Sequence, residues 1–420
     1  MSRLQSIIYE LKSKKEFYMF IKNLSVLFSF RSIGILFSVI VAIMGARLLN
    51  VSELGKYNLV INFSNLLVIP LAFGVNTTLL KILPENPENQ RGTILGTVAL
   101  CNMFLCCLIT LIYLILLPYI SFSLKLSNAT CFFAIGTAII SNFCILAETL
   151  LKNQQCFITI GISKLVGALV VFLLYLFSLK YAYLISINNF LFYNIMGQLI
   201  IFLMMSIKTK TGKLRFTLSF AKSIYTYSSI NMVSWLFTTS LYSIDIYILS
   251  YFTSYYEVGI YSVYQVMLRN FFSIFFNDIF AAVFVPTIVA LDKTKVNLYK
   301  QATKVLPFVF IIISLGTAVL SCVLIYAYGN QYTLNPLYVL LVAIGIGLHG
   351  VYLGLNSILI IEGIVGAKIS LSVLGKPFIL LILITVLFTY YWGIVGTFLA
   401  FIVNQVILIF RLFKLLPKSP

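Results

Sequence analysis

Four basic residues lie inside long apolar stretches of the sequence: Arg31, Lys164, Arg269 and Lys376. An ionised side chain near the centre of a bilayer costs about 2.5–3.5 kcal/mol on insertion scales, so such a residue usually faces water, a partner or a ligand. A guanidinium group also presents a planar fork of donors that matches the oxygens of a phosphate or a carboxylate. These residues therefore predict the binding of an anion inside a membrane.

Helical spacing places both arginines on faces of small and polar residues. At 100° per residue, Arg31 shares a face of about 60° with glycines and a serine, and Arg269 shares one of about 80° with Gln265 and two serines. Lys164 and Lys376 lie closer to predicted helix ends, so each either faces the same cavity or extends its ammonium group to the membrane surface.

A third polar face runs along the stretch 222–250. It consists of Ser228, Asn231, Trp235, Thr238, Tyr242 and Asp245, with apolar residues on the opposite side. We expect this helix to separate a polar cavity from lipid. Asn231 and Tyr242 therefore join Arg31, Lys164, Gln265, Arg269 and Lys376 as candidate substrate ligands.

Three acidic residues are candidates for coupling transport to an ion gradient: Glu148, Asp245 and Asp278. Each also has a structural interpretation. Glu148 lies one turn before Lys152 and would form an ion pair at a helix end. Asp278 lies on the face opposite Arg269 and would pair with a neighbouring helix, whereas Asp245 lies near a predicted span end, where water would solvate it.

The single histidine, His349, lies in the motif Gly345-Ile346-Gly347-Leu348-His349-Gly350. This spacing matches a dinucleotide-binding loop, but no strand precedes it and the surrounding sequence is an apolar helix, so no dinucleotide is expected. The glycines instead predict the close approach of a neighbouring helix. The imidazole either relays protons, because it titrates near neutral pH, or bonds a backbone carbonyl.

The elements that must position these residues are membrane-spanning helices. Hydrophobic residues make up 61% of the 420 and charged residues 10%, and the mean hydropathy is +1.05, values that exclude a soluble protein. A helix needs about 20 mostly apolar residues to cross a bilayer. Such runs predict an all-α protein with twelve spans, at 24–48, 57–80, 93–118, 130–151, 157–179, 182–206, 222–250, 258–290, 304–328, 334–361, 369–391 and 393–415.

A repeated motif divides the chain into two similar halves. Glu53-Leu54-Gly55-Lys56-Tyr57 is echoed 204 residues later by Glu257-Val258-Gly259-Ile260-Tyr261. Such spacing indicates two six-helix bundles related by pseudo-symmetry. We expect the first bundle at 1–206, a charged cytoplasmic linker at 207–217 and the second bundle at 218–420.

The basic residues predict the orientation. If both termini and the even-numbered turns share one side, that side holds 21 of the 29 Lys and Arg residues, and the other side holds Arg47, Lys56, Lys125 and Lys180. Basic loops remain in the cytoplasm, so both termini are expected there. The net charge of +18 mainly reflects this excess beside anionic lipid rather than nucleic-acid binding.

Several activities are not expected. No segment between predicted spans is long enough for a nucleotide-binding or catalytic domain, so neither ATP hydrolysis nor another enzymatic activity is predicted. The seven cysteines lack metal-ligand spacing, and we expect no metal or cofactor. Two alternatives stay open: an exporter of organic cations, which would favour an acidic cavity, and a polysaccharide polymerase or ligase, which would need a larger external loop.

The first half resembles a known family. The segment Ala46-Arg47-Leu48-Leu49-Asn50-Val51-Ser52-Glu53-Leu54-Gly55-Lys56-Tyr57, followed by Phe73-Gly74-Val75-Asn76 and Lys81-Ile82-Leu83-Pro84-Glu85, looks like the start of a Wzx-type O-antigen flippase. The segment from Asp245 to Tyr261, with Pro286, resembles the second half of that family. The family often has a basic residue after this aspartate. Here Ile246 follows, so an ion pair at Asp245 is not expected.

This resemblance implies the fold shared by multidrug exporters of the MATE type and lipid II flippases, with two six-helix bundles around a central cavity. It implies transport of an undecaprenyl-diphosphate-linked oligosaccharide from the cytoplasmic to the periplasmic leaflet of a bacterial inner membrane. Alternating access coupled to H+ or Na+ would drive the transport. A polysaccharide polymerase and a chain-length regulator are the protein partners that this function implies, in the synthesis of lipopolysaccharide.

Overall fold

The computed structural model describes residues 33–181, 184–209, 214–274, 276, 295–361 and 364–415. Every regular element in these ranges is helical, which confirms the predicted all-α class. The helices are a first helix over Ile33–Leu48, α2 (Val51–Ala72), α3 (Val75–Glu85), α4 (Glu88–Leu124), α5 (Asn128–Asn153), α6 (Phe157–Lys180), α7 (Ile187–Lys208), α8 (Leu218–Phe252), α9 (Tyr255–Tyr261), the π-helix η2 (Ser262–Val266), α10 (Met267–Ile274), α12 (Lys295–Tyr328), α13 (Pro336–Ile361), α14 (Ile364–Gly375) and α15 (Phe378–Leu415).

The number of spans agrees with the prediction. Within the described ranges, eight helices are long and apolar enough to cross a bilayer, and the bent pair of α2 and α3 makes a ninth. The 38 residues of α15 form two helices, because Gly393 has a non-helical φ of 54° and ψ of −132°. With the first helix and the continuous run from α9 to α10, the arrangement is consistent with twelve spans.

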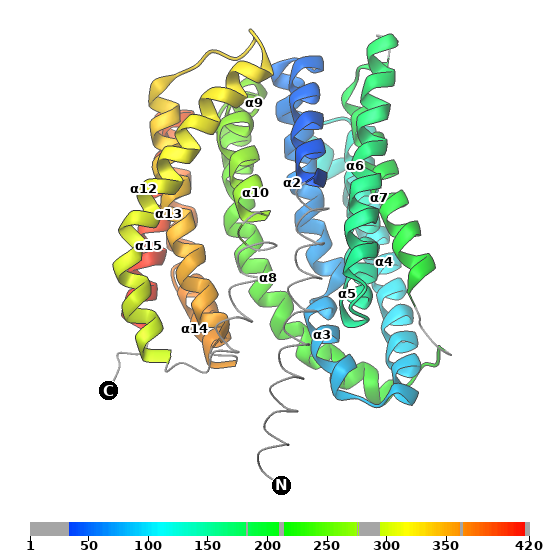
Figure 1. Ribbon diagram of the computed structural model, residues 1–420. Helices are drawn as coiled ribbons and strands as arrows, with labels where there is room; N and C mark the ends of the chain where they lie inside the picture. Colours follow the sequence, from blue (N-terminus) through cyan, green and yellow to red (C-terminus); the bar gives the residue numbers. More distant parts are fainter. Residues whose placement is uncertain are drawn as a thin grey trace.

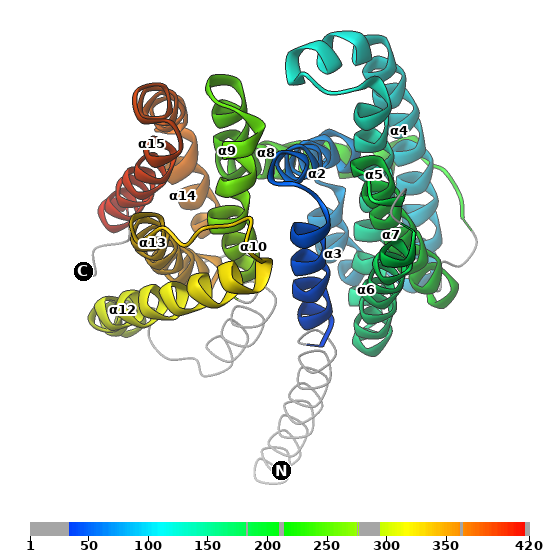
Figure 2. The same cartoon turned by 90° about the horizontal axis from the view of Figure 1, so that it is seen from above.

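The helices gather into two groups that face each other. Seen from above, α4 to α7 lie on one side and α12 to α15 on the other, with α2, α8, α9 and α10 between them (Figure 2). Helix α8 runs obliquely across the middle, and its start lies beside α3 and α4 (Figure 1). Further along, the same helix packs against α15 of the second group. The central helices are thus placed to line any space between the groups.

The second predicted span is a bent pair of helices. Helices α2 and α3 meet at an angle of 42°, at a break formed by Phe73 and Gly74. Both residues have positive φ values, of 49° and 68°. A Cβ atom on Gly74 would lie 2.4 Å from the backbone oxygen of Ser228, so only glycine permits this approach to α8. Ser228 then donates a hydrogen bond to Thr78 at 2.8 Å.

The two copies of the repeated motif begin two helices and contact each other. The polar segment between the first two predicted spans forms mostly the first two turns of α2, because Asn50 caps that helix by accepting a hydrogen bond from the backbone of Glu53. Ser254 caps α9 in the same way through Glu257. A Cβ atom on Gly55 would lie 2.8 Å from the backbone nitrogen of Gly259, so the two helices touch backbone to backbone.

This contact joins the halves at one end of the molecule. At the same end, the Arg47 guanidinium donates a 2.7 Å hydrogen bond to the Ala327 carbonyl, and Gln331 donates one to the Ala46 carbonyl. We call this the motif end. The other end, where α3 and α7 finish and α4 and α8 begin, is called the basic end because it carries most of the described lysines and arginines outside the helix centres.

The glycine-rich helix α13 lies inside its group, as its small residues predict. In its most apolar stretch, 67% of the residues are buried. A Cβ atom on Gly345 would lie 2.8 Å from the Phe401 ring of α15, and one on Gly347 would lie 2.1 Å from the Ser314 hydroxyl oxygen of α12. The glycines therefore admit neighbouring helices, as expected for a small-residue face.

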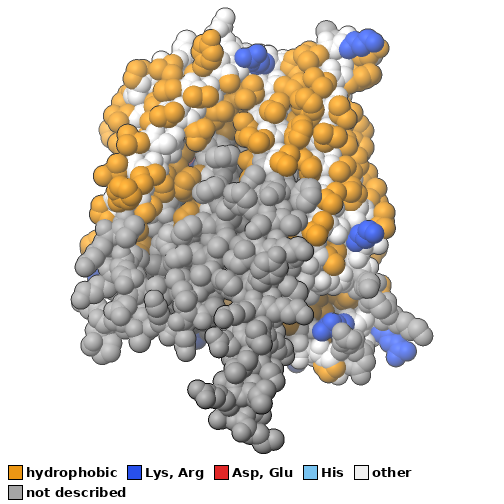
Figure 3. Space-filling view, viewed as in Figure 1, with side chains coloured by type: hydrophobic (Ala, Val, Ile, Leu, Met, Phe, Trp, Pro, Cys, Tyr) orange, Lys and Arg blue, Asp and Glu red, His pale blue; other side chains and the backbone are white. Residues whose placement is uncertain are grey.

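The outer surface is suited to lipid. On the face in Figure 3, hydrophobic side chains form a broad band over the described helices. Long helices satisfy their own backbone hydrogen bonds, which is why they are stable in hydrocarbon. The structure thus has the features of a multi-pass membrane protein.

Candidate functional site

A cavity of about 520 Å³ lies between the two groups of helices. Helices α2, α5, α6 and α7 contribute residues from the first half, and α8, α10 and α13 contribute residues from the second. Among its lining residues are two of the four predicted basic residues, Lys164 and Arg269, together with Glu148 and Tyr242. The structure therefore brings residues far apart in the sequence into one central site.

Arg269 lines this cavity and forms an ion pair with Asp245. Its side chain is only 4% exposed, and its Nη1 atom lies 2.5 Å from Oδ2 of Asp245, which is itself 7% exposed. The Tyr261 hydroxyl donates a hydrogen bond to the same oxygen at 2.5 Å. The guanidinium carbon also lies 5.6 Å from the centre of the Phe401 ring. The arginine is thus held by groups from α8, α9 and α15.

The structure corrects two expectations about Asp245. It is buried rather than solvated near a helix end, and it forms the ion pair that the residue after it did not suggest. The basic partner is not the next residue along α8 but Arg269, which lies 24 positions away on α10. A buried carboxylate needs such a partner, because leaving it unpaired in a poorly solvated site is costly.

The π-helix η2 explains why only part of the predicted polar face lines the cavity. Its five residues, Ser262–Val266, are all buried, and the side-chain amide of Gln265 makes no hydrogen bond among the described residues. A π-helical turn shifts the residues after it around the helix axis. Arg269, Asn270 and Ser273 therefore line the cavity, whereas Ser262 and Gln265 do not.

The first half contributes a second ion pair to the cavity. Lys164 of α6 lies 2.8 Å from one carboxylate oxygen of Glu148 on α5, and Lys152 lies 2.9 Å from the other. The expected pair between Glu148 and Lys152 is thus present, but Glu148 also bridges to α6. Lys164 remains in the cavity wall rather than extending to the surface.

Tyr242 and His349 form a polar cluster beside Arg269. Their rings lie 4.9 Å apart, and the His349 ring nitrogens lie 3.4 Å from the side-chain oxygens of Ser273 and Gln405. His349 therefore contacts side chains rather than the backbone carbonyl considered from the sequence. Tyr242 lines the cavity, and its hydroxyl lies beside the side chain of Gln405.

The remaining predicted residues lie elsewhere. Lys376 is exposed at the junction of α14 and α15, where Gly375 and Pro377 do interrupt the helix as expected. Asn231 donates a 3.2 Å hydrogen bond to Thr78 and takes no part in the cavity lining. Arg31 and Asp278 lie outside the described residues.

The cavity also contains neutral polar residues that sequence reasoning missed. They are Asn62, Asn65, Ser141, Gln198, Thr239, Ser243 and Asn270. Part of this set is ordered by a chain of hydrogen bonds, since Ser141 donates to Gln198 at 2.6 Å and Gln198 donates to Asn194 at 2.8 Å. The presence of Asn and Gln inside apolar stretches was a signal for cavity residues. The helical face of each residue alone does not show which of these side chains come together in one cavity.

The geometry indicates what the site can bind. Each described cation in the cavity wall is neutralised by a carboxylate, so the site is polar without a large excess of charge. An anionic ligand would have to compete with Glu148 and Asp245 for the two cations. Amides, hydroxyls and aromatic rings surround these cations and suit a ligand with many hydroxyl groups.

Known structures share this fold. The lipid II flippase MurJ in an inward closed conformation has 16% sequence identity and a TM-score of 0.67, over 93% of this chain and 87% of that one. A mutant of the Vibrio cholerae MATE transporter VcmN has 13% identity and a TM-score of 0.65, over 94% and 96% of the two chains. An inward-facing multidrug resistance MATE transporter of the MOP superfamily has 13% identity and a TM-score of 0.65, over 94% of this chain and all of the other.

Sequence comparison identifies the family. No curated protein sequence matches the chain significantly. The sequence pattern of the polysaccharide biosynthesis proteins, in contrast, matches residues 20–292, which is more than half of the chain. This match shows that the chain belongs to the polysaccharide biosynthesis protein family.

Proposed function

We propose that this protein is a Wzx-type flippase for an undecaprenyl-diphosphate-linked oligosaccharide, such as an O-antigen repeat unit. It would move this lipid from the cytoplasmic to the periplasmic leaflet of a bacterial inner membrane. The observation that carries the proposal is the pair of neutralised cations, Lys164 and Arg269, in the wall of one polar cavity between the halves. The family membership supports a lipid-linked glycan as the substrate class.

The diphosphate would bind by exchange of ionic partners. In the structure, Arg269 and Lys164 each contact one carboxylate. The oxygens of a diphosphate can accept bidentate hydrogen bonds from a guanidinium group and can form an ion pair with an ammonium group. The arginine would then exchange Asp245 for a phosphate, so the cation is never left unpaired in a poorly solvated place.

This exchange also offers a route to ion coupling. A carboxylate that loses its cationic partner at a buried site is destabilised, and uptake of H+ or Na+ compensates for the loss. Glu148, which lines the cavity, and Asp245, which pairs with Arg269 behind the wall, are the candidates among the described residues. Ion uptake and substrate binding would therefore be linked through shared cations rather than through a separate ion site.

The sugars would contact the uncharged part of the wall. Asn62, Asn65 and Gln198 present amide groups, and Trp235 and Tyr242 present aromatic rings. Such groups recognise hydroxyl-rich ligands through hydrogen bonds and apolar contact with the faces of the sugar rings. The cations among the described lining residues are Lys164 and Arg269, whereas a nucleic acid would require a long cationic tract.

The test is complementation of a flippase-deficient strain, with surface glycan as the readout. Arg269→Ala should abolish surface glycan, and Arg269→Lys should restore only part of it, because an ammonium group cannot reproduce the bidentate fork. Arg411→Ala is a matched control, since Arg411 bonds the Ser372 carbonyl outside the cavity. The double variant Arg269→Ala/Asp245→Asn removes both buried charges and separates loss of folding from loss of the cation.

We expect the double variant to insert at the normal level and to remain inactive. Full complementation by the double variant would contradict a phosphate-binding role for Arg269. Accumulation of the lipid-linked glycan in the cytoplasmic leaflet of the inactive strains would identify the blocked step as transport.

The alternative function is export of organic cations, which the carboxylates of Glu148 and Asp245 favour. Under this alternative, the protein would raise resistance to cationic dyes and leave surface glycan unchanged. Measuring both phenotypes in the same deletion strain distinguishes the two functions.

A further inference from the structure

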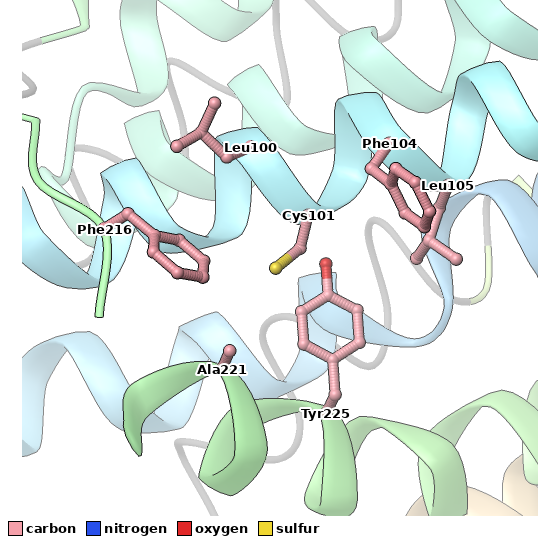
Figure 4. Close-up of a pocket in the computed structure, with 7 residues that line it drawn as sticks. All are labelled: Leu100, Cys101, Phe104, Leu105, Phe216, Ala221 and Tyr225. Atoms are coloured by element: carbon pink, nitrogen blue, oxygen red, sulfur yellow. The ribbon is translucent and has the colours of Figure 1, made fainter. Parts of the chain in front are cut away.

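A second pocket lies outside the central cavity, on the side of the molecule where α4 meets the start of α8. Its volume is about 620 Å³, and it is lined by Leu100, Cys101, Phe104, Leu105, Phe216, Ala221 and Tyr225. Figure 4 shows Phe104 and Leu105 on α4 at one side, with Phe216 opposite them across Cys101. Phe104 and Phe216 are exposed, by 67% and 49%, so the pocket opens to the membrane rather than to the transport cavity.

The floor of this pocket is built by firm contacts between the two halves. The segment before α8 is fixed to α4, because the Arg215 amide donates to the Gly92 carbonyl and the Thr217 amide donates to the Thr97 hydroxyl. A Cβ atom on Gly96 would lie 2.5 Å from the Arg215 nitrogen, so glycine is required for this approach. The pocket is therefore a formed cleft between packed elements.

One polar atom in the pocket has no hydrogen-bond partner among the described residues. The Tyr225 hydroxyl is buried and makes no hydrogen bond within the described ranges, although Phe73 packs 5.6 Å from the tyrosine ring. In Figure 4 this hydroxyl points into the pocket beside Cys101. A buried hydroxyl without a partner costs free energy, so an acceptor on a ligand would be favoured at this point.

Two exposed cations are the chain neighbours of residues that line this pocket. Arg215 precedes Phe216 directly, and Lys222 follows Ala221. Lys222 lies three residues before Tyr225 on α8, within about 60° around the helix and about 4.5 Å along its axis. Cationic groups therefore lie toward the basic end, the polar hydroxyl lies below them, and the apolar wall lies deeper in the membrane.

This order of groups matches the order of groups in a phospholipid. We propose that the pocket binds one anionic phospholipid from the leaflet at the basic end. Its phosphate lies at Arg215 and Lys222, an ester carbonyl accepts a hydrogen bond from Tyr225, and one acyl chain fills the apolar cleft. The lipid joins α4 of the first half to the start of α8 and so stabilises the contact between them.

The test measures lipid that remains bound during purification. Full-length protein in mild detergent is analysed by native mass spectrometry, with phosphatidylglycerol as the added anionic probe and phosphatidylcholine as the zwitterionic one. We expect one retained phosphatidylglycerol per chain and at least a fivefold lower retention of phosphatidylcholine. Lys222→Gln and Tyr225→Phe should each reduce the phosphatidylglycerol retention severalfold.

Matched controls separate the pocket from the general lipid surface. Cys101→Trp fills the pocket and should abolish retention, whereas Cys322→Trp changes an exposed cysteine of α12 and should leave retention unchanged. Lys208→Gln removes a cation at the same end of the molecule, outside the pocket. Equal retention in the pocket variants and the controls would overturn the proposal, and so would retention of a polyprenyl lipid in place of a phospholipid.

Discussion

Arg269 and Asp245 show how a buried charge is kept in this membrane protein. The two residues come from different helices, and Tyr261 completes the site by donating to the same carboxylate oxygen. Breaking a buried ion pair by removing one partner typically costs about 3–5 kcal/mol, because the remaining charge is uncompensated. Asp245 and Tyr261 therefore hold the guanidinium group in place, and under the proposed function an anionic ligand would replace the carboxylate.

Asp245→Asn should lower stability and increase the response to anions. Thermal unfolding in detergent should show a lower midpoint for this variant than for the wild-type protein. Added inorganic diphosphate should raise the midpoint more in Asp245→Asn than in the wild type, since the unpaired Arg269 gains a partner. Glu53→Gln, at the motif end, is the control. An unchanged midpoint together with no effect of diphosphate would show that the ion pair neither stabilises the fold nor limits anion binding by Arg269.

At this scale the sequence allowed a partial prediction. The apolar context of Arg269 was enough to predict it as a cavity residue, because a cation in such a stretch needs a polar environment. For Lys164 the same context left the cavity and the membrane surface as alternatives. Their partners could not be predicted, since pairing depends on which helices are neighbours. The π-helix before Arg269 also changes the face of every later residue, and an ideal-helix projection cannot anticipate it.

At the scale of elements, the central feature is the contact between α2 and α9. The repeat predicted two related halves, but it did not predict that the two copies of the motif would touch each other. Only glycine at both positions permits the contact, because a Cβ atom on Gly259 would lie 2.0 Å from the Val51 carbonyl oxygen. An alternating-access cycle has to separate these helices when the motif end opens.

Gly259→Ala should therefore weaken closure of the motif end. A cysteine pair at Lys56 and Tyr255, where the ammonium group now lies 5.3 Å from the tyrosine ring, reports this closure by cross-linking. We expect efficient cross-linking in the parent protein and at least a threefold decrease with Gly259→Ala. Gly316→Ala is the matched control, because a Cβ atom there meets nothing within 4 Å. Cross-linking that is equal in both variants would show that the glycine contact does not hold this end closed.

At the scale of the whole molecule, the hydropathy of the chain predicted the fold well. Long apolar runs have few alternatives in a bilayer, so the helical class and the approximate number of spans could be predicted from hydropathy. Helix ends were less predictable. Helix α2 begins at Val51 rather than at residue 57, because its first turns carry polar residues that cap the helix beyond the apolar run.

The orientation of the molecule remains a prediction, and cysteine labelling tests it. In a background without native cysteines, Ala129→Cys at the start of α5 should react with an impermeant maleimide in intact cells. Gln90→Cys at the start of α4 should react only after the membrane is permeabilised. Both positions are exposed, so access to the reagent depends on the side of the membrane. Labelling of Gln90→Cys in intact cells would reverse the inside and outside assignments.

Helix α8 has a mechanical consequence for any such cycle. It is fixed to α3 through Ser228 in its first third. At its last residue it contacts α15, because the Phe252 ring lies 5.5 Å from that of Tyr390. Because it belongs to both groups, the groups cannot rock apart without bending it. Its middle contains no proline, but the hydroxyls of Ser234 and Thr238 bond the backbone carbonyls four residues earlier, and such bonds favour helix bending. If the two groups of helices moved apart, α8 would bend and store elastic energy, and it would release that energy when the groups came together again.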